Sequence, residues 1–294
     1  MVDIRKNVWQ WGDRTVAYWE AGPSAPGATD LPAAVLIHGF GASAGHWRKT
    51  FPALAPQVRT YALDLLGFGA SDKPKPGPDF AYTFETWGAQ INAFCQEVVG
   101  TPVTLVGNSI GAIAAMQAAV MAPAQTQRVI LLNCSLRLLH ERKQAGLPWY
   151  RRVGSRWVQR LLQNRAIARL FFAQVANPQA VRNVLKQAYA RHEAIDSELI
   201  AMLLAPARHP HAVDVFVAFT GYSGGPTPED LLAQLPCPAV VLWGDRDPWE
   251  PIALGAKFQE FACVQAFVPL PGVGHCPQDE APELVNPLLL QFLR

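Results

Sequence analysis

Gly107-Asn108-Ser109-Ile110-Gly111 is the stretch that decides how this chain folds. An apolar run at residues 103–106 precedes it, and a run of helix-forming residues at 112–119 follows it. A serine between two such glycines, on a tight turn from strand to helix, is typical of a nucleophile elbow. The turn holds the serine in a strained backbone conformation, and a side chain on either glycine would collide with the neighbouring strand or helix. A glycine-rich turn without chemistry is the alternative.

Strand and helix patterns alternate along most of the chain. Strands are expected at residues 15–19, 33–38, 58–64, 103–106, 128–133, 238–243 and 264–270, and a closing helix at about 282–292. The first strand belongs to an opening hairpin. This alternation predicts an α/β fold with a mainly parallel central sheet and helices on both faces. Ligands of such sheets bind at the carboxyl ends of the strands.

The alternation is interrupted once. Between Cys134 and Gly225 there is no convincing strand, only helical runs separated by Pro or Gly. We therefore expect an inserted helical cap, or lid, at residues 134–225. Residues 1–133 and 226–294 then form the core domain.

Composition narrows the classes of partner. Of the 294 residues, 50% are hydrophobic and 16% are charged, which is typical of a compact enzyme. The net charge of +2 is too small to indicate nucleic acid. The five cysteines are scattered and have no Cys-x-x-Cys spacing, so we expect neither a disulfide framework nor a zinc site. We expect no metal and no cofactor.

The N-terminal residues show neither the apolar region of a signal peptide nor the Arg- and Ser-rich character of a transit peptide. No run of eighteen apolar residues occurs. We expect a soluble protein on the cytoplasmic side, with any membrane contact peripheral.

Acyl transfer by Ser109 requires a base and a carboxylate that orients it. His275 is the candidate base, because it lies in a glycine-lined loop after the last expected strand. Asp247, just past the preceding strand, is the candidate carboxylate. Asp245 is the alternative, but it lies nearer the strand end. The order Ser, Asp, His along the chain is that of α/β-hydrolases.

Small residues after the first core strand predict an oxyanion hole. His38-Gly39-Phe40-Gly41 lets backbone amides approach a ligand, and the amide of Phe40 is the expected donor. The amide of Ile110, directly after the nucleophile, is the second donor. Gly39 and Gly41 are also candidate substrate contacts. His38 is expected to order this loop through hydrogen bonds rather than to titrate.

Four further residues are assigned roles. Asp64 and Ser71, in a polar loop beside the expected cleft, are interpreted as structural and should tie turns together. Trp149 in the cap and Trp249 beside Asp247 are candidate contacts to the substrate.

Over its full length the chain resembles a serine α/β-hydrolase, and more narrowly the chlorophyll dephytylase and pheophytinase group. The similar motifs lie at 64–67, 107–111, 247–249 and 274–283 in the core, and at 177–178, 185–189, 192 and 209–210 in the cap. Ile110 departs from the group, in which Leu-Gly-Gly commonly follows the serine. Plant members carry plastid transit segments, which are absent here; a cyanobacterial-type protein or a mature form would explain the difference.

The resemblance implies a serine esterase that hydrolyses the phytyl ester of chlorophyll or pheophytin through an acyl-enzyme. It implies a chlorophyll-type pigment as the substrate, without cofactor, and association with a thylakoid-type membrane. Three alternatives stay open. A carbon–carbon bond hydrolase of dienone acids uses the same triad but should bury arginines for its carboxylate substrate. Another carboxylesterase, or a non-catalytic pigment-binding protein on this scaffold, would also fit.

The cap sequence is basic. Between Arg137 and Arg169, eight arginines and one lysine accompany a single acidic residue, Glu141. Aromatic and aliphatic residues are interleaved with them, and this pattern fits peripheral contact with an anionic membrane surface. A solvated basic face is the alternative.

Overall fold

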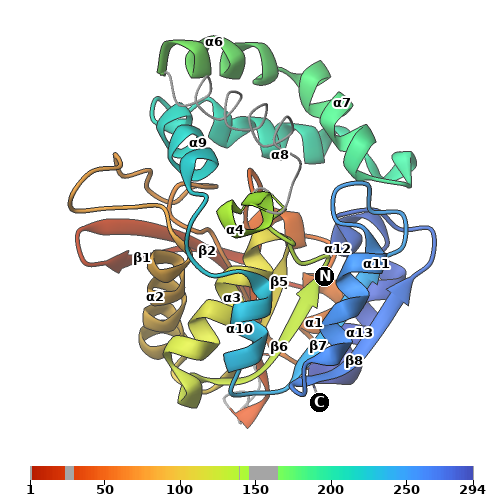
Figure 1. Ribbon diagram of the computed structural model, residues 1–294. Helices are drawn as coiled ribbons and strands as arrows, with labels where there is room; N and C mark the ends of the chain where they lie inside the picture. The colour runs from red at the N-terminus through yellow and green to blue at the C-terminus, as the bar shows by residue number, and fades with distance from the viewer. Residues whose placement is uncertain (1, 24–29, 139, 146–164, 294) are drawn as a thin grey trace.

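The computed structural model describes residues 2–23, 30–138, 140–145 and 165–293 (Figure 1). Among these residues, eight strands form one sheet in the order β1-β2-β4-β3-β5-β6-β7-β8. The strands are β1 (Arg5–Trp11), β2 (Arg14–Ala21), β3 (Ala33–Ile37), β4 (Arg59–Leu63), β5 (Val103–Asn108), β6 (Thr126–Leu132), β7 (Ala239–Gly244) and β8 (Val264–Leu270). β2 pairs antiparallel with β1 and β4, and all other pairs are parallel. The expected α/β class and its opening hairpin are confirmed.

Helices cover both faces of the sheet. The core helices are α1 (Phe51–Leu54), α2 (Phe84–Phe94), α3 (Ile110–Met121), α10 (Pro228–Gln234), α11 (Ile252–Gly255), α12 (Pro277–Glu280) and α13 (Pro282–Leu293). Short helices of other types are η2 (Ala44–Trp47), η3 (Cys95–Val99), η4 (Pro123–Gln125) and η6 (Ala256–Glu260). α2, α3 and α10 pack on one face, and α1 and α13 pack on the other.

The central strands are apolar on both sides because both sides are covered. Every residue of β3 is buried. Since side chains alternate along a strand, Val35 and Ile37 join the cluster that contains Trp87 of α2, whereas Leu36 joins the cluster that contains Leu289 of α13. A continuous apolar run, rather than an alternating one, is the pattern of a strand buried on both faces.

All described elements of residues 134–225 are helical. They are α4 (Glu141–Ala145), α6 (Arg165–Val175), α7 (Pro178–Ala188), η5 (His192–Ala194), α8 (Ser197–Ala207) and α9 (Ala212–Gly221). α6 to α9 lie above the carboxyl ends of the parallel strands, and the two helical layers of the core flank the sheet below them (Figure 1). The division into a core and a separate cap domain stays a prediction.

Side-chain caps fix the starts of two of these helices. Asn177 precedes α7 and accepts a hydrogen bond from the amide of Ala180 at 2.9 Å. Asp196 precedes α8 and accepts one from the amide of Leu199 at 2.7 Å. Such caps satisfy amides that have no partner within the helix.

A single residue, Ser109, connects β5 to α3. Ser109 has φ 57° and ψ −119°, a conformation that L-residues rarely adopt. A Cβ on Gly107 would lie 2.3 Å from the carbonyl oxygen of Gly111, and one on Gly111 would lie 2.4 Å from the carbonyl oxygen of Ile37. The strand, turn and helix expected here are present. Both glycines are required because backbone, which cannot move aside, lies against them.

Gly107→Ala is expected to lower the free energy of unfolding by at least about 2 kcal/mol, because the added methyl meets the first turn of α3. Chemical denaturation monitored by circular dichroism measures the change. Gly77→Ala is the matched control, since a Cβ at that position has no neighbour within 4 Å. Equal stability of the two variants would contradict the packing described for the turn.

Candidate active site

The candidate residues converge at the carboxyl ends of four parallel strands. The loop after β3 carries His38 and Phe40, and Ser109 follows β5. Asp247 follows β7 and His275 follows β8. In a parallel sheet these ends share one edge, beneath the helices drawn at the top of Figure 1.

A short hydrogen bond joins His275 to Asp247. The His275 Nδ1–H donates to Oδ2 of Asp247 at 2.7 Å, and both side chains are buried. The other carboxylate oxygen accepts hydrogen bonds from the amides of Trp249 at 2.9 Å and Glu250 at 3.0 Å. Because the carboxylate fixes the proton on Nδ1, the ring presents Nε2 as its acceptor.

Asn133 completes the environment of Asp247 and was not anticipated from the sequence. Its Nδ2 donates to Oδ2 of Asp247 at 2.7 Å, and its Oδ1 accepts from the amide of Gly244 at 3.0 Å. Asn133 directly follows β6 and has φ 41°. The available signal was an Asn just after a strand. Asn is among the residues that adopt a positive φ most readily, and a sharp turn at a strand end can require that conformation.

Asp245 has a different task from Asp247. Its exposed side chain accepts a hydrogen bond from the amide of Gly272 at 2.7 Å, which ties the loop after β7 to the loop after β8. The structure therefore brings Asp247, and not Asp245, to His275.

Asn108 links the candidate nucleophile to the histidine loop. Its Nδ2 donates to the carbonyl oxygens of Leu132 at 3.2 Å and His275 at 3.1 Å. Ser109 is the next residue, and a Cβ on Gly39 would lie 3.2 Å from its Cβ. In the described part of the chain, the Ser109 hydroxyl is not hydrogen-bonded to the His275 ring.

His38 is a structural residue, as the sequence suggested. Its Nδ1–H donates to the carbonyl oxygen of Gly39 at 2.8 Å, and its Nε2 accepts from the amide of Leu65 at 3.1 Å. This pair of bonds requires the neutral ring. Complete burial lowers the pKa of His38 to about 4, so the ring stays neutral at physiological pH.

Asp64 and Ser71 are also structural, as expected. The Asp64 carboxylate accepts hydrogen bonds from the amides of Ala44 at 2.5 Å and Ala70 at 2.7 Å. The Ser71 hydroxyl donates to the carbonyl oxygen of Asp64 at 2.7 Å and accepts from the amide of Ala17 at 2.9 Å. These bonds hold the loop after β4 against the loop after β3.

An apolar pocket of about 80 Å³ begins at the loop after β3. It lies between that loop and helices α6, α8 and α9, and its lining is Phe40, Gly41, Gly67, Phe68, Phe172, Leu203, Pro206, Ala207, Ala212, Val215 and Phe216. None of these lining residues is charged. The Phe40 ring is 40% exposed and stacks on Phe219 with ring centroids 4.9 Å apart. The pocket is thus suited to an apolar group.

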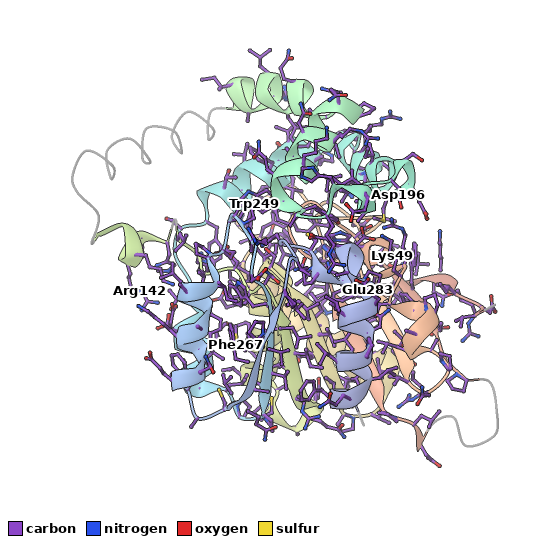
Figure 2. The ribbon with its side chains drawn as sticks, turned by 90° about the vertical axis from the view of Figure 1, so that its right-hand side faces the viewer. Lys49, Arg142, Asp196, Trp249, Phe267 and Glu283 are labelled. Atoms are coloured by element: carbon purple, nitrogen blue, oxygen red, sulfur yellow. The ribbon has the colours of Figure 1, made fainter. Side chains whose placement is uncertain are left out.

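Of the two candidate tryptophans, Trp249 lies at the site. Its ring centroid is 5.0 Å from that of His275, and the side chain is 41% exposed. Figure 2 shows Trp249 between the sheet and the helices above it. Trp149 lies outside the described residues, as does most of the basic stretch between Arg137 and Arg169.

The segment after α7 is fastened to the histidine loop, a connection that the sequence did not reveal. The amide of His275 donates to the carbonyl oxygen of Ala188 at 2.8 Å. Glu280 accepts from the amides of Ala190 and Arg191, both at 2.8 Å, and from Gly274 at 2.9 Å. The helices above the sheet and the histidine loop therefore share one hydrogen-bonded junction.

A buried polar chain lies beside this junction. His46 donates from Nε2 to the Tyr189 hydroxyl at 2.9 Å, and Tyr189 donates to Asp279 at 3.2 Å. Arg48 bonds Asp279 at 2.5 Å and Asp196 at 2.8 Å. Lys49 and Asp196 mark this side of the molecule in Figure 2. Burial lowers the pKa of His46 to about 3, so this histidine is also neutral.

The sequence profile of the alpha/beta hydrolase family matches residues 34–288. The chain belongs to this family, and it is a hydrolase. No helix of the described residues combines the length and apolarity that crossing a bilayer demands.

Among relatives, chloroplastic pheophytinase of Arabidopsis thaliana is 26% identical over 90% of this chain; the match spans 62% of that longer protein. The 2-hydroxy-6-oxo-6-(2'-aminophenyl)hexa-2,4-dienoic acid hydrolase of Metapseudomonas resinovorans is 24% identical over 94% of this chain and 86% of its own. Among solved structures, a serine hydrolase of carbazole degradation, the CarC enzyme, superposes with a TM-score of 0.76 at 20% identity, covering 99% of both chains. The last similarity concerns the fold alone.

The two buried neutral histidines predict how stability depends on pH. Unfolding releases His38 to its ordinary pKa near 6.5, so the unfolded chain binds more protons between about pH 6.5 and 4. The contribution of the neutral His38 ring to the free energy of unfolding is therefore present above pH 6.5. It is lost as the pH falls toward 4, and the loss amounts to about 3 kcal/mol.

His38→Gln should therefore flatten the pH dependence of the free energy of unfolding between pH 6.5 and 4, whatever its effect at pH 7. Urea unfolding at several pH values measures this slope. His192→Gln, at an exposed histidine, is the control and should retain the wild-type slope. An unchanged slope in His38→Gln would contradict a neutral buried ring.

Proposed function

We propose that this hydrolase is a serine esterase that cleaves the phytyl ester of chlorophyll or pheophytin through an acyl-enzyme. The observation that carries the proposed chemistry is the 2.7 Å hydrogen bond from His275 to Asp247, at the sheet edge where the strained Ser109 turn also lies. The arrangement fits the roles of base, orienting carboxylate and nucleophile.

In the proposed reaction, Ser109 Oγ attacks the ester carbonyl while His275 Nε2 takes the hydroxyl proton. Asp247 holds the imidazole tautomer and stabilises the imidazolium that forms. The amides of Phe40 and Ile110 donate to the oxyanion; the first amides of a helix such as α3 have no acceptor within it. The alcohol leaves with the proton from His275. Water, deprotonated by the same ring, then hydrolyses the acyl-enzyme and frees the acid.

The apolar pocket at Phe40, of about 80 Å³, supports an apolar group beside the ester and would hold the first part of a long hydrocarbon chain. Its lining from α8 and α9 is uncharged, so a phytyl chain would meet only apolar and backbone atoms. The similarity to pheophytinase, a protein from the group that the sequence resembles, supports the same substrate class. We propose that Gly39, Gly41 and Trp249 contact the substrate around the ester.

Hydrolysis of a dienone acid is the second candidate function, favoured by the similarity to the dienoic acid hydrolase. That substrate carries a carboxylate, whose burial demands a cationic partner. The pocket lining at Phe40 offers none among the described residues. The uncharged lining therefore favours the apolar ester.

We also propose that residues 134–225 form a cap that touches an anionic membrane, from which the pigment is taken up. On α6, Leu170 is 68% exposed beside the exposed Arg169, and a basic apolar surface of this kind binds such membranes. Peripheral association with a thylakoid-type membrane follows from this proposal.

Ser109→Ala is expected to reduce hydrolysis of p-nitrophenyl esters and of pheophytin by at least about 10⁴-fold, because no nucleophile remains. Chromatography of the released pigment acid and absorbance of p-nitrophenol measure the two rates. Ser197→Ala, at an exposed serine that begins α8, is the control and should keep wild-type rates. Wild-type turnover by Ser109→Ala would rule out the proposed mechanism.

The substrate is tested by placing a charge in the pocket. Leu203→Glu should lower kcat/KM for detergent-dispersed pheophytin at least about tenfold, since a buried carboxylate opposes a hydrocarbon chain. Hydrolysis of p-nitrophenyl acetate, which carries no long hydrocarbon chain, should change less than about threefold. Val184→Glu, at an exposed position of α7, is the control. If wild-type protein hydrolyses dienone acids but not pheophytin, the phytyl ester assignment is wrong.

A further inference from the structure

Glu250 is a buried carboxylate that the proposed reaction leaves unused. It lies three residues after Asp247, and only 9% of the residue is exposed. Its Oε2 accepts a hydrogen bond from the amide of Leu136 at 3.0 Å, and its own amide donates to Oδ1 of Asp247 at 3.0 Å. Its carbonyl oxygen accepts from Trp243 Nε1 at 2.9 Å. Glu250 is therefore held rigidly between the carboxylate loop and the start of residues 134–225.

The titratable groups around Glu250 come from three loops. Asp247 lies on its own loop, His275 on the loop after β8, and the buried thiol of Cys134 follows β6. Beyond them, Lys143 bonds Glu229 at 2.7 Å and the carbonyl oxygen of Leu136 at 2.6 Å.

None of the ion pairs among the described residues includes Glu250. The amide of Glu250 bonds one oxygen of Asp247 and His275 bonds the other, so the Asp247 carboxylate links Glu250 to the imidazole. His275 acquires its positive charge during ester hydrolysis, when it takes the proton of Ser109. That charge forms in a buried site, where opposite charges attract more strongly than in water.

We propose that Glu250 is a second carboxylate of the site, a positioning residue that acts through His275 by stabilising its imidazolium and by fixing Leu136 against the Asp247 loop. This inference rests on the proposed function, because it requires His275 to be the base. Glu250 itself neither touches the ester nor transfers a proton.

Its state of charge should change near neutral pH. Burial is the main cause that raises the pKa of Glu250 to about 7, and the negative charge of Asp247 adds to it. Above pH 7 the carboxylate is charged and supports the imidazolium; below pH 7 it becomes protonated and this support is lost. The charge of Glu250 should therefore contribute to the acid limb of activity.

The test compares Glu250→Gln, which keeps a hydrogen-bond acceptor for Leu136 but carries no charge, with Glu250→Asp, which keeps the charge. Rates of p-nitrophenyl butyrate hydrolysis and of fluorophosphonate labelling are measured from pH 5 to 9. For Glu250→Gln we expect the midpoint of the acid limb to move down by roughly 0.5 to 1 pH unit, and the plateau rate to fall about three- to tenfold. Glu250→Asp should keep the wild-type midpoint. Glu229→Gln, which removes a nearby carboxylate bonded to Lys143, should match wild type.

Thermal unfolding gives a readout that does not depend on activity. Because the folded-state pKa of Glu250 is raised, the stability it provides is present at low pH and is lost as the pH rises through about 7. Glu250→Gln should therefore gain melting temperature relative to wild type at pH 9 but not at pH 5.

Three results would overturn the inference while the proposed triad stands. One is a Glu250→Gln profile with the wild-type midpoint and a merely lower plateau, which indicates packing alone. Another is a Glu229→Gln profile in which the midpoint of the acid limb moves down as far as it does in Glu250→Gln. The third is failure of Glu250→Gln to fold. The carboxyl group is half protonated at pH 7, so the fold already accepts a neutral side chain at this position, and the neutral amide of Gln should be accepted as well. If wild-type protein shows neither ester hydrolysis nor labelling of Ser109, the proposed function fails first, and the role of Glu250 fails with it.

Discussion

The close approach of β5, α3 and β3 is the constraint on which the rest of the molecule depends. Gly107 lies against the backbone of α3, and Gly111 lies against the end of β3. Only with hydrogen in place of these two side chains can the chain turn so sharply that Ser109 stays at φ 57°. The strain is maintained because α3 is buried along most of its length between the sheet and the outer helices, so relaxing the turn would disrupt the core. The position of one hydroxyl thus follows from the packing of three elements.

The second constraint is the number of donors that converge on Asp247. A buried carboxylate needs hydrogen-bond donors, and this one has four, contributed by His275, Asn133, Trp249 and Glu250. These residues follow three different strands, so sheet register determines the orientation of the imidazole. The same edge of the sheet is covered by helices α8 and α9, which contribute an uncharged pocket. The fold defines a family of hydrolases, whereas the covering helices are where substrate choice would be made.

Sequence reasoning anticipated what local patterns encode. Continuous apolar runs predicted the parallel strands because both sheet faces are covered, and turn chemistry predicted the elbow at Ser109. Asp247 and His275 were predicted as partners because catalytic groups gather at strand ends, and a hydrogen bond joins them. Asn133 and Glu250 were missed because their importance arises from partners more than a hundred residues away in sequence. No periodicity signals such pairings. The junction of Glu280 with the segment after α7 was missed for the same reason.

The covalent intermediate offers the most direct measurement. Wild-type protein mixed with p-nitrophenyl butyrate would be quenched in acid within the first turnovers, digested and mapped by mass spectrometry. We expect a butyryl group on the peptide that contains Ser109, fragmenting at that residue, and no such adduct on the other serines or the cysteines. Steady turnover of the ester with the acyl group on another side chain, or with no acyl-enzyme at any quench time, would contradict the role given to the Ser109 turn.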